Sequence, residues 1–311
     1  MRGGYSRSGR KDQDVVNSLQ TPTDLPDLAG VEHRFVDVGD VRLHVAEAGE
    51  GPPLLLLHGW PQNWWCWRDL IGPLARTHRV LVPDLRGFGW SDAPPGDYAK
   101  ATLAADIVGL LDAEGIDRAR VVGHDWGGYV AYLLALDHAE RVERFVALDI
   151  PPPWPQRPNR GMAILPFFLT YQAALATPGF GAGLQHRVPG FVKTMLRRGA
   201  GPDFRWRDSD LDLYAAKLSE PDRARAMSHL YRTFLAKEFA ASRKRHPDDL
   251  TVDGLLVWGE ASLLHRMVRR GLEPGPRLRV ESIPGGGHFL PEETPDAVLA
   301  LVSEHLSSPQ T

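Results

Sequence analysis

The stretch GHDWG, residues 123–127, carries the side chain best suited to chemistry. An apolar run, residues 119–122, leads into it and a helical pattern follows, so we expect a tight turn between a strand and a helix. Small residues two positions before and after Asp125 are typical of a nucleophile elbow, G-x-S-x-G, with Asp replacing Ser. A Cβ at Gly123 or Gly127 would crowd that strained turn. The alternative is an ordinary turn with a solvated Asp125 at a helix N-cap.

A histidine that could serve as a base comes late in the chain. His288 ends the loop Gly285-Gly286-Gly287-His288, which follows a strand expected at residues 278–283. Three glycines allow this loop to bend so that the imidazole faces the elbow at the carboxyl edge of a parallel sheet. Taken alone, His288 is more simply an ordinary surface histidine. The chain order Asp, Asp, His, with each residue just past a strand, favours a catalytic set.

Strands that alternate with helices position these residues. Residues 33–38 and 41–46 predict a hairpin, and Leu54 to Leu57 predict a strand buried on both faces. The alternation implies an α/β fold with a mostly parallel sheet and right-handed crossovers. We expect further strands at residues 79–82, 119–122, 144–148, 254–258 and 278–283, and helices at 64–75, 102–114, 127–136 and 297–306.

The pattern changes at Ile150, where three prolines follow. From there to about residue 246 we find helical stretches broken by Pro and Gly, which predict an inserted helical cap. We therefore assign residues 1–25 to a mobile N-terminal arm, residues 26–150 and 250–311 to an α/β core, and residues 151–249 to the cap.

Composition argues against several classes of protein. The 311 residues carry a net charge of −3 without a basic block, so we expect no nucleic-acid partner. The single cysteine, Cys66, rules out an intrachain disulfide and fits a reducing, cytoplasmic location. We expect no secretory signal and no membrane span. The histidines lack ligand spacing such as HExxH, so we expect neither metal nor cofactor. The oligomeric state stays open, a homodimer included.

Four stretches together resemble one family. They are HGWP at residues 58–61, DLRGFGWSD at 84–92, GHDWGG at 123–128 and GGGHFLPEETP at 285–295. In this order they are similar to the epoxide hydrolase and haloalkane dehalogenase branch of the α/β-hydrolase fold, from about residue 32 to 306. The resemblance implies that fold, with an inserted helical cap.

The resemblance also implies roles for the site residues. Asp125 would attack an sp3 carbon and form an alkyl-enzyme ester, and His288 would deprotonate the water that cuts it. The backbone N–H groups of Trp60 and Trp126 would form the oxyanion hole. The aromatic surroundings, with Trp60, Pro61 and Trp126 as expected substrate contacts, suggest an apolar substrate.

The leaving group separates the two chemistries of this branch. A ring oxygen that becomes an alkoxide needs a proton donor, and a phenol is protonated near neutrality. Tyr171, in a Tyr-Gln stretch followed by Pro-Gly, and Tyr231 are similar to the two cap tyrosines of epoxide hydrolases. Either could instead be a packing aromatic. Trp60 replaces the asparagine of many haloalkane dehalogenases, and Trp126 replaces the arginine of fluoroacetate dehalogenases.

The acid that orients the histidine departs from the family pattern. The family usually places an aspartate in a WGE-x-D stretch, and this chain has Ser262 there. Some relatives take the acid from the end of the strand after the elbow helix, where this chain has Asp149. We therefore favour Asp149, with Glu260 as second choice. The alternative is that Asp149 merely caps the entry to the cap.

These observations predict an epoxide hydrolase that converts a small apolar epoxide and water to a vicinal diol. The alternative reaction is haloalkane dehalogenation. A non-catalytic ligand-binding protein of this fold is also open, because a fold does not fix function.

Overall fold

The computed structural model describes residues 22–308. Residues 1–21, most of the predicted arm, lie outside this range. The rest of the arm contacts the folded chain, because the Asp24 carboxylate accepts a hydrogen bond from Trp90 Nε1 at 2.9 Å and pairs with Lys217 at 2.6 Å.

One eight-stranded sheet forms the centre of the molecule, in the order β1-β2-β4-β3-β5-β6-β7-β8. β1 and β2 form the predicted antiparallel hairpin, and β2 also pairs antiparallel with β4. The other neighbours are parallel, as the alternation of elements predicted. The strands are β1 (Glu32–Val38), β2 (Val41–Ala48), β3 (Pro53–Leu57), β4 (Arg79–Pro83), β5 (Ala119–His124), β6 (Val142–Leu148), β7 (Gly254–Gly259) and β8 (Leu278–Ile283).

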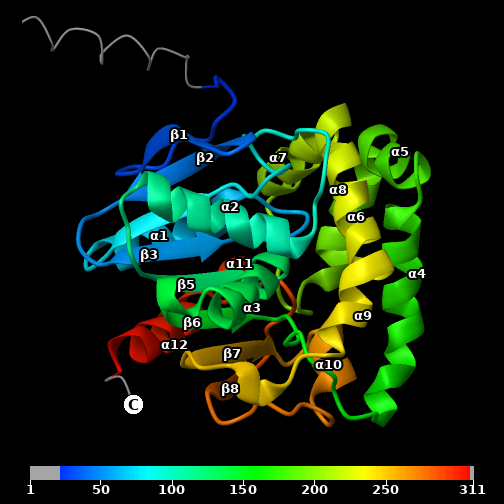
Figure 1. The fold of residues 1–311 in the computed structure, drawn as a ribbon. Coiled ribbons are helices and arrows are strands. Elements are labelled where there is room, and N and C mark those ends of the chain that lie inside the picture. The colour runs from blue at the N-terminus through cyan, green and yellow to red at the C-terminus, as the bar shows by residue number, and fades with distance from the viewer. Residues whose placement is uncertain (1–21, 309–311) are drawn as a thin grey trace, which may run out of the picture.

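Helices cover both faces of this sheet. In Figure 1, α2 and α3 lie in front of the strands, whereas α1 packs against α12. The leucines of β3 are fully buried between these layers, as expected for a central parallel strand. The helices of the core are α1 (Arg68–Ala75), α2 (Lys100–Ala113), α3 (Trp126–Asp137), α10 (Leu263–Val268), α11 (Leu290–Glu293) and α12 (Pro295–Ser307).

The helix predicted at residues 64–75 is two elements. A 3-10 turn, Trp64–Trp67, precedes α1. The Asn63 side chain caps the turn by accepting from the Trp65 N–H at 3.1 Å, and Asp84 accepts from the Trp64 N–H at 2.8 Å. These side-chain acceptors satisfy N–H groups at the start of the segment, which have no intrahelical partner.

Residues 151–249, which we call the cap, connect β6 to β7. Their described elements are helices, and Figure 1 shows them standing together beside the sheet. They are α4 (Leu165–Ala176), α5 (Phe180–Arg187), α6 (Pro189–Gly199), α7 (Asp208–Leu218), α8 (Pro221–Thr233) and α9 (Phe239–Ser242), with 3-10 turns at Arg160–Ile164 and Pro247–Asp249 and a π-helical turn at Phe234–Glu238.

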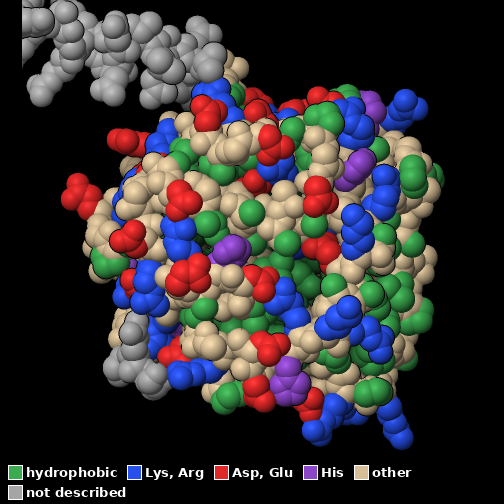
Figure 2. Space-filling view, in the orientation of Figure 1, with side chains coloured by type: hydrophobic (Ala, Val, Ile, Leu, Met, Phe, Trp, Pro, Cys, Tyr) green, Lys and Arg blue, Asp and Glu red, His purple; other side chains and the backbone are tan. Residues whose placement is uncertain are grey.

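Part of the cap exposes apolar side chains. Phe167 of α4 is 49% exposed, and Phe180 at the start of α5 is 59% exposed. Figure 2 shows hydrophobic side chains gathered on the side of the molecule where α4 lies. Over residues 22–308, no single helix is long and apolar enough to cross a membrane. The segments Arg160–Ala176 and Phe180–Arg187 pass that test only together, and they are bent by 88°.

Candidate active site

Asp125 lies in the turn that joins β5 to α3. Its backbone has φ 52° and ψ −124°, a conformation that is rare for a residue with a side chain. A Cβ on Gly123 or Gly127 would lie 2.2 or 2.1 Å from a backbone oxygen, so the predicted crowding is confirmed. The turn therefore has the shape of a nucleophile elbow and presents the Asp125 carboxylate at the start of a helix.

Two backbone N–H groups face the Asp125 carboxylate. The Trp60 N–H donates to Oδ1 at 2.9 Å. Burial would raise the pKa of Asp125, but the hydrogen bond and charge of His288 outweigh it, and the Trp126 amide adds to the effect. The pKa of Asp125 is lowered as a result, so this side chain is ionised near neutrality. An oxyanion on Oδ1 would meet the Trp60 N–H directly, with the Trp126 amide close to the same carboxylate.

His288 lies between two carboxylates. Its Nε2 is 3.4 Å from Oδ2 of Asp125, and its Nδ1 is 2.7 Å from Oδ2 of Asp149. Burial alone would lower the pKa of His288. The hydrogen bonds and charges of Asp125 and Asp149 overcome that effect and raise it to about 10. The two neighbouring carboxylates therefore favour the protonated form of His288.

Asp149 is fully buried at the end of β6, with φ 45°. Besides His288, its carboxylate accepts from the Ser262 hydroxyl at 2.6 Å and from the Gly259 N–H at 3.2 Å. Glu260 is exposed and accepts from the Ser282 hydroxyl instead. Of the two predicted acids, only Asp149 contacts His288 within the described chain.

His124, which the sequence analysis did not single out, holds the His288 loop. Its Nε2 lies 2.7 Å from the backbone oxygen of His288, and the two rings are 4.8 Å apart. Burial, followed by the charge of His288, lowers the pKa of His124 to about 3. A neutral ring can donate only one N–H, so Nε2 carries the hydrogen. Its position next to Asp125 was the only signal in the sequence.

Both predicted cap tyrosines reach the cavity at Asp125. This cavity, of about 120 Å³, is lined by Asp125, His288, Tyr171 and Tyr231, with Trp60 and Phe168 among the apolar walls. A second cavity of about 400 Å³ also contains Asp125 and Tyr171 in its lining, together with Trp126 and the prolines at 151–153. Pro61 is buried but lines neither cavity, so the structure does not bring this predicted contact to the site.

The two tyrosine rings pack against each other and against the oxyanion residues. Tyr171 and Tyr231 have ring centroids 6.2 Å apart, and Tyr231 lies 5.7 Å from both the Trp60 and Trp126 rings. Burial raises the pKa of both phenols, and the negative charge of Asp125 raises it further. Both hydroxyls therefore stay protonated, and they are hydrogen-bonded to each other beside the cavity.

The indole nitrogens of the two site tryptophans differ in their partners. Trp60 Nε1 donates to the Gln185 side chain of α5 at 2.9 Å. Trp126 Nε1 is buried and faces the Tyr231 phenol as a hydrogen-bond donor, which offsets part of the increase in the pKa of Tyr231. Both indole donors are therefore directed at side chains of the cap.

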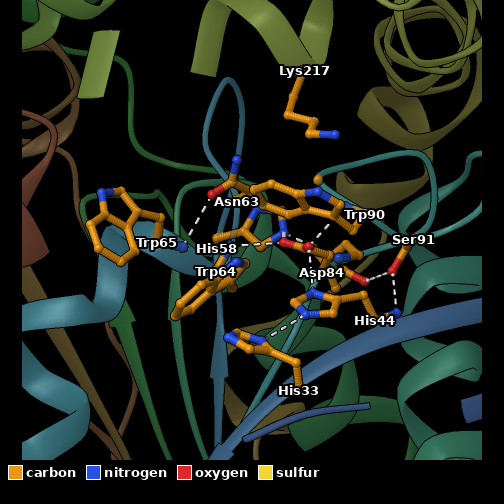
Figure 3. A network of polar contacts seen from close by, with 12 residues as sticks. His33, His44, His58, Asn63, Trp64, Trp65, Asp84, Trp90, Ser91 and Lys217 are labelled. Carbon is orange, nitrogen blue, oxygen red and sulfur yellow. Dashed lines mark hydrogen bonds and ion pairs between the residues drawn. The ribbon is translucent and has the colours of Figure 1, made fainter. Parts of the chain in front are cut away.

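A buried network holds the turn that carries Trp60. Figure 3 shows Asp84 between His44 and His58. Its carboxylate lies 2.8 Å from His44 Nδ1 and accepts from the Trp90 N–H at 2.9 Å. His58 Nε2 accepts from the Leu85 N–H at 3.1 Å, so the hydrogen is on Nδ1, which lies 3.2 Å from the Gly59 oxygen. Asp84 thus has a structural role, fixing the loops beside the oxyanion turn.

Comparisons with known proteins agree with this geometry. The family model described as alpha/beta hydrolase fold matches residues 52–295. A soluble epoxide hydrolase of Corynebacterium sp. is 32% identical over 86% of this chain and 95% of its own length. A fluoroacetate dehalogenase of Burkholderia sp. is 31% identical over 89% of this chain and 94% of its own.

A solved structure is also similar. The epoxide hydrolase CorEH, solved without ligand, superposes with a TM-score of 0.78 and 27% identity, and covers 89% of this chain and 99% of its own. The comparisons therefore contain both chemistries that the sequence analysis considered, and epoxide hydrolases are found among both the sequence relatives and the solved structures.

Proposed function

The chain belongs to the α/β-hydrolase fold family, and we propose that it is an epoxide hydrolase acting through an aspartyl ester. The proposed substrate is a small apolar epoxide, and the product is the vicinal diol. In this proposal the core (residues 26–150 and 250–311) carries Asp125, Asp149 and His288, and the cap (residues 151–249) carries the tyrosines.

One observation carries the proposal. The Asp125 carboxylate of the core and the phenols of Tyr171 and Tyr231 of the cap line the same cavity. A nucleophile that attacks a ring carbon and a donor that protonates the ring oxygen must face one substrate together. Halide departure requires no proton, so two protonated phenols favour an epoxide.

The first proposed step is alkylation. Oδ1 of Asp125 is held by the Trp60 N–H, so Oδ2 attacks the epoxide carbon. The C–O bond of the ring breaks, and the oxygen takes a proton from Tyr171 or Tyr231. The product is a hydroxyalkyl ester beside a tyrosinate. Since esterification removes the charge of Asp125, the pKa of His288 falls, and its proton restores the phenol.

The second proposed step is ester hydrolysis. Neutral His288 takes a proton from water through Nε2, and the hydroxide attacks the ester carbonyl of Asp125. The oxyanion that forms on Oδ1 is stabilised by the N–H groups of Trp60 and Trp126. Asp149 stabilises the imidazolium, as in other catalytic triads. When the tetrahedral intermediate collapses, the diol leaves with the proton of the His288 imidazolium. The carboxylic acid formed on Asp125 then returns its proton to His288.

A haloalkane dehalogenase is the second candidate, because Trp126, whose Nε1 is a buried donor, lines a cavity together with Asp125. It could hold a departing halide, and a fluoroacetate dehalogenase is among the relatives. Trp60 Nε1 is already bound to Gln185, and Trp126 Nε1 faces the Tyr231 phenol, so neither indole donor is free for a halide in this structure. The epoxide reaction uses more of the groups that line the cavity.

A direct assay separates the candidates. Styrene oxide and a simple bromoalkane are each offered to the purified protein, with diol formation and halide release both recorded. We expect diol from styrene oxide and at most a trace of bromide. Bromide release without diol would establish the dehalogenase instead. Binding without turnover of either compound would favour a non-catalytic ligand-binding protein.

A further inference from the structure

A lysine is buried behind the candidate site. Lys100 is the first residue of α2, and its side chain has no exposed surface. Lysine is almost never fully buried unless its ammonium is paired, because desolvation of a charge is costly. Lys100 lines neither cavity at Asp125, so it does not touch a substrate bound there.

The partners of Lys100 belong to the cap. Its Nζ donates to Oε2 of Glu238 at 2.9 Å and to the backbone oxygen of Leu230 at 2.6 Å. The Lys100 backbone N–H donates to the other oxygen of Glu238 at 2.6 Å. Leu230 immediately precedes Tyr231 in α8, and Glu238 ends the π-helical turn that follows this helix. One core residue thus holds both sides of the segment that carries Tyr231.

The Lys100 ammonium also lies against the residue next to Asp125. Nζ is 4.4 Å from the centroid of the Trp126 ring and 5.1 Å from that of Phe234. The Tyr231 ring meets the Trp126 ring nearly at right angles, at 76°. A desolvated cation over an indole face is a strong contact, so it fixes the ring against which Tyr231 packs.

The charge of Lys100 persists near neutrality. Burial lowers its pKa to about 8, and the carboxylates of Glu238, Asp125 and Asp97 limit that decrease. The ammonium is therefore mostly protonated at neutral pH, when it can donate to Glu238 and Leu230 together.

We propose that Lys100 is a positioning residue for ring opening, which sets the place of the Tyr231 phenol relative to Asp125. This inference rests on the proposed epoxide hydrolase reaction. The Leu230 carbonyl fixes α8 from one side, and the Trp126 ring fixes Tyr231 from the other. A displacement of about 1 Å in such a group can reduce a rate by about 10²-fold.

The test measures alkylation alone. In a His288→Gln background the ester should accumulate, and the rate of adduct formation with styrene oxide is followed by intact-protein mass spectrometry. Lys100→Met keeps the apolar stem and removes the ammonium. We expect alkylation to slow by about 10²-fold. Arg245→Met is the matched control, because it removes a partly exposed ion pair between cap and core, to Asp137 at 2.7 Å, and should leave the rate unchanged.

A double variant distinguishes positioning from general damage. If Lys100 acts through Tyr231, Lys100→Met combined with Tyr231→Phe should alkylate no more slowly than Tyr231→Phe alone. If the rate losses of the two single changes multiply in the double variant, the inference is overturned. It is also overturned if Lys100→Met alkylates as fast as the His288→Gln background. Absence of any adduct with Lys100 intact would overturn the proposed reaction and this inference with it.

A milder variant covers the case in which Lys100→Met does not fold. Glu238→Gln keeps one neutral acceptor for Lys100 and removes the opposite charge. We expect a loss of alkylation rate of about 10-fold, again without further loss on adding Tyr231→Phe. An unchanged rate in Glu238→Gln would overturn the inference by itself.

Discussion

The Ser262 hydroxyl donates to Oδ2 of Asp149 across 2.6 Å, and the same oxygen lies 2.7 Å from Nδ1 of His288. The family pattern expects an aspartate at position 262. In this chain the carboxylate comes from the neighbouring strand end, and the serine supports it. A hydroxyl thus stands at the position where the family pattern has the acid, and it donates to the acid that contacts the imidazole.

The role of Asp149 can be tested by replacing its charge. Asp149→Asn should slow ester hydrolysis on the order of 10²–10⁴-fold, since an amide stabilises the imidazolium less and can favour the wrong tautomer. Alkylation should change much less. Glu260→Gln is the control, because Glu260 is exposed and bonded to Ser282. Single-turnover kinetics separate the two steps. The reverse outcome, with only Glu260→Gln impaired, would assign the acid to Glu260.

The position of Ser262 beside Asp149 predicts a rescue. Ser262→Ala should slow ester hydrolysis by about 10- to 100-fold, the effect of losing one hydrogen bond to a buried charge. Ser262→Asp in the Asp149→Asn background should recover part of the lost rate, because a carboxylate returns beside His288. The same Ser262→Asp change alone should harm the enzyme, since it buries two adjacent carboxylates. Failure of the double variant to exceed Asp149→Asn would contradict this arrangement.

The phenols should act in ring opening. Tyr171→Phe with Tyr231→Phe should reduce alkylation by roughly 10²–10⁴-fold, the usual contribution of a general acid. Each single variant should lose less, because one donor remains. Tyr98→Phe serves as the control, since its hydroxyl donates to the Pro94 carbonyl and its ring lines neither cavity at Asp125. Equal alkylation rates in the double variant and the unmodified protein would favour the dehalogenase.

The two steps should depend differently on pH. Ester hydrolysis needs neutral His288, so its rate should rise with pH. Its midpoint should lie below the value of about 10 in the free enzyme, because esterification removes the charge of Asp125. Alkylation needs only ionised Asp125, whose pKa is lowered, so it should show no rising limb over neutral pH. Single-turnover rates across pH measure both, and a rising limb in alkylation would contradict the assignment.

Stability should also follow His288. The pKa of His288 is raised in the folded protein from 6.5 to about 10, so its stabilising contribution is complete below pH 6.5. That contribution is lost as pH rises from 6.5 to about 10. Urea unfolding at several pH values should show this decline, and His288→Gln should flatten it. A decline of equal size in His288→Gln would assign it to another group.

Local patterns in the sequence predicted most of the fold. The four leucines of β3 and the alternation in β1 and β2 identify strands by themselves, because each pattern follows the burial of one element. The 3-10 turn at Trp64 was not predicted, and its first N–H donates to Asp84, twenty residues away, a contact that no local pattern reveals.

The site was predictable where a motif fixes a residue's neighbours. Asp125 and His288 follow from the elbow and the glycine loop. The support of Asp149 by Ser262 and the contact of Lys100 with Glu238 link positions 113 and 138 residues apart. No periodicity in the sequence relates such pairs, so these contacts can be identified only in the folded structure.

The central claim is that Asp125, rather than water, attacks the epoxide. A single turnover in H₂¹⁸O, with the unmodified protein in excess over styrene oxide, tests this directly. If Asp125 forms an ester, the diol receives the carboxylate oxygen of Asp125, and the ¹⁸O appears in the peptide that contains Asp125. Incorporation of ¹⁸O into the diol in that first turnover, with none in the peptide, would contradict the account.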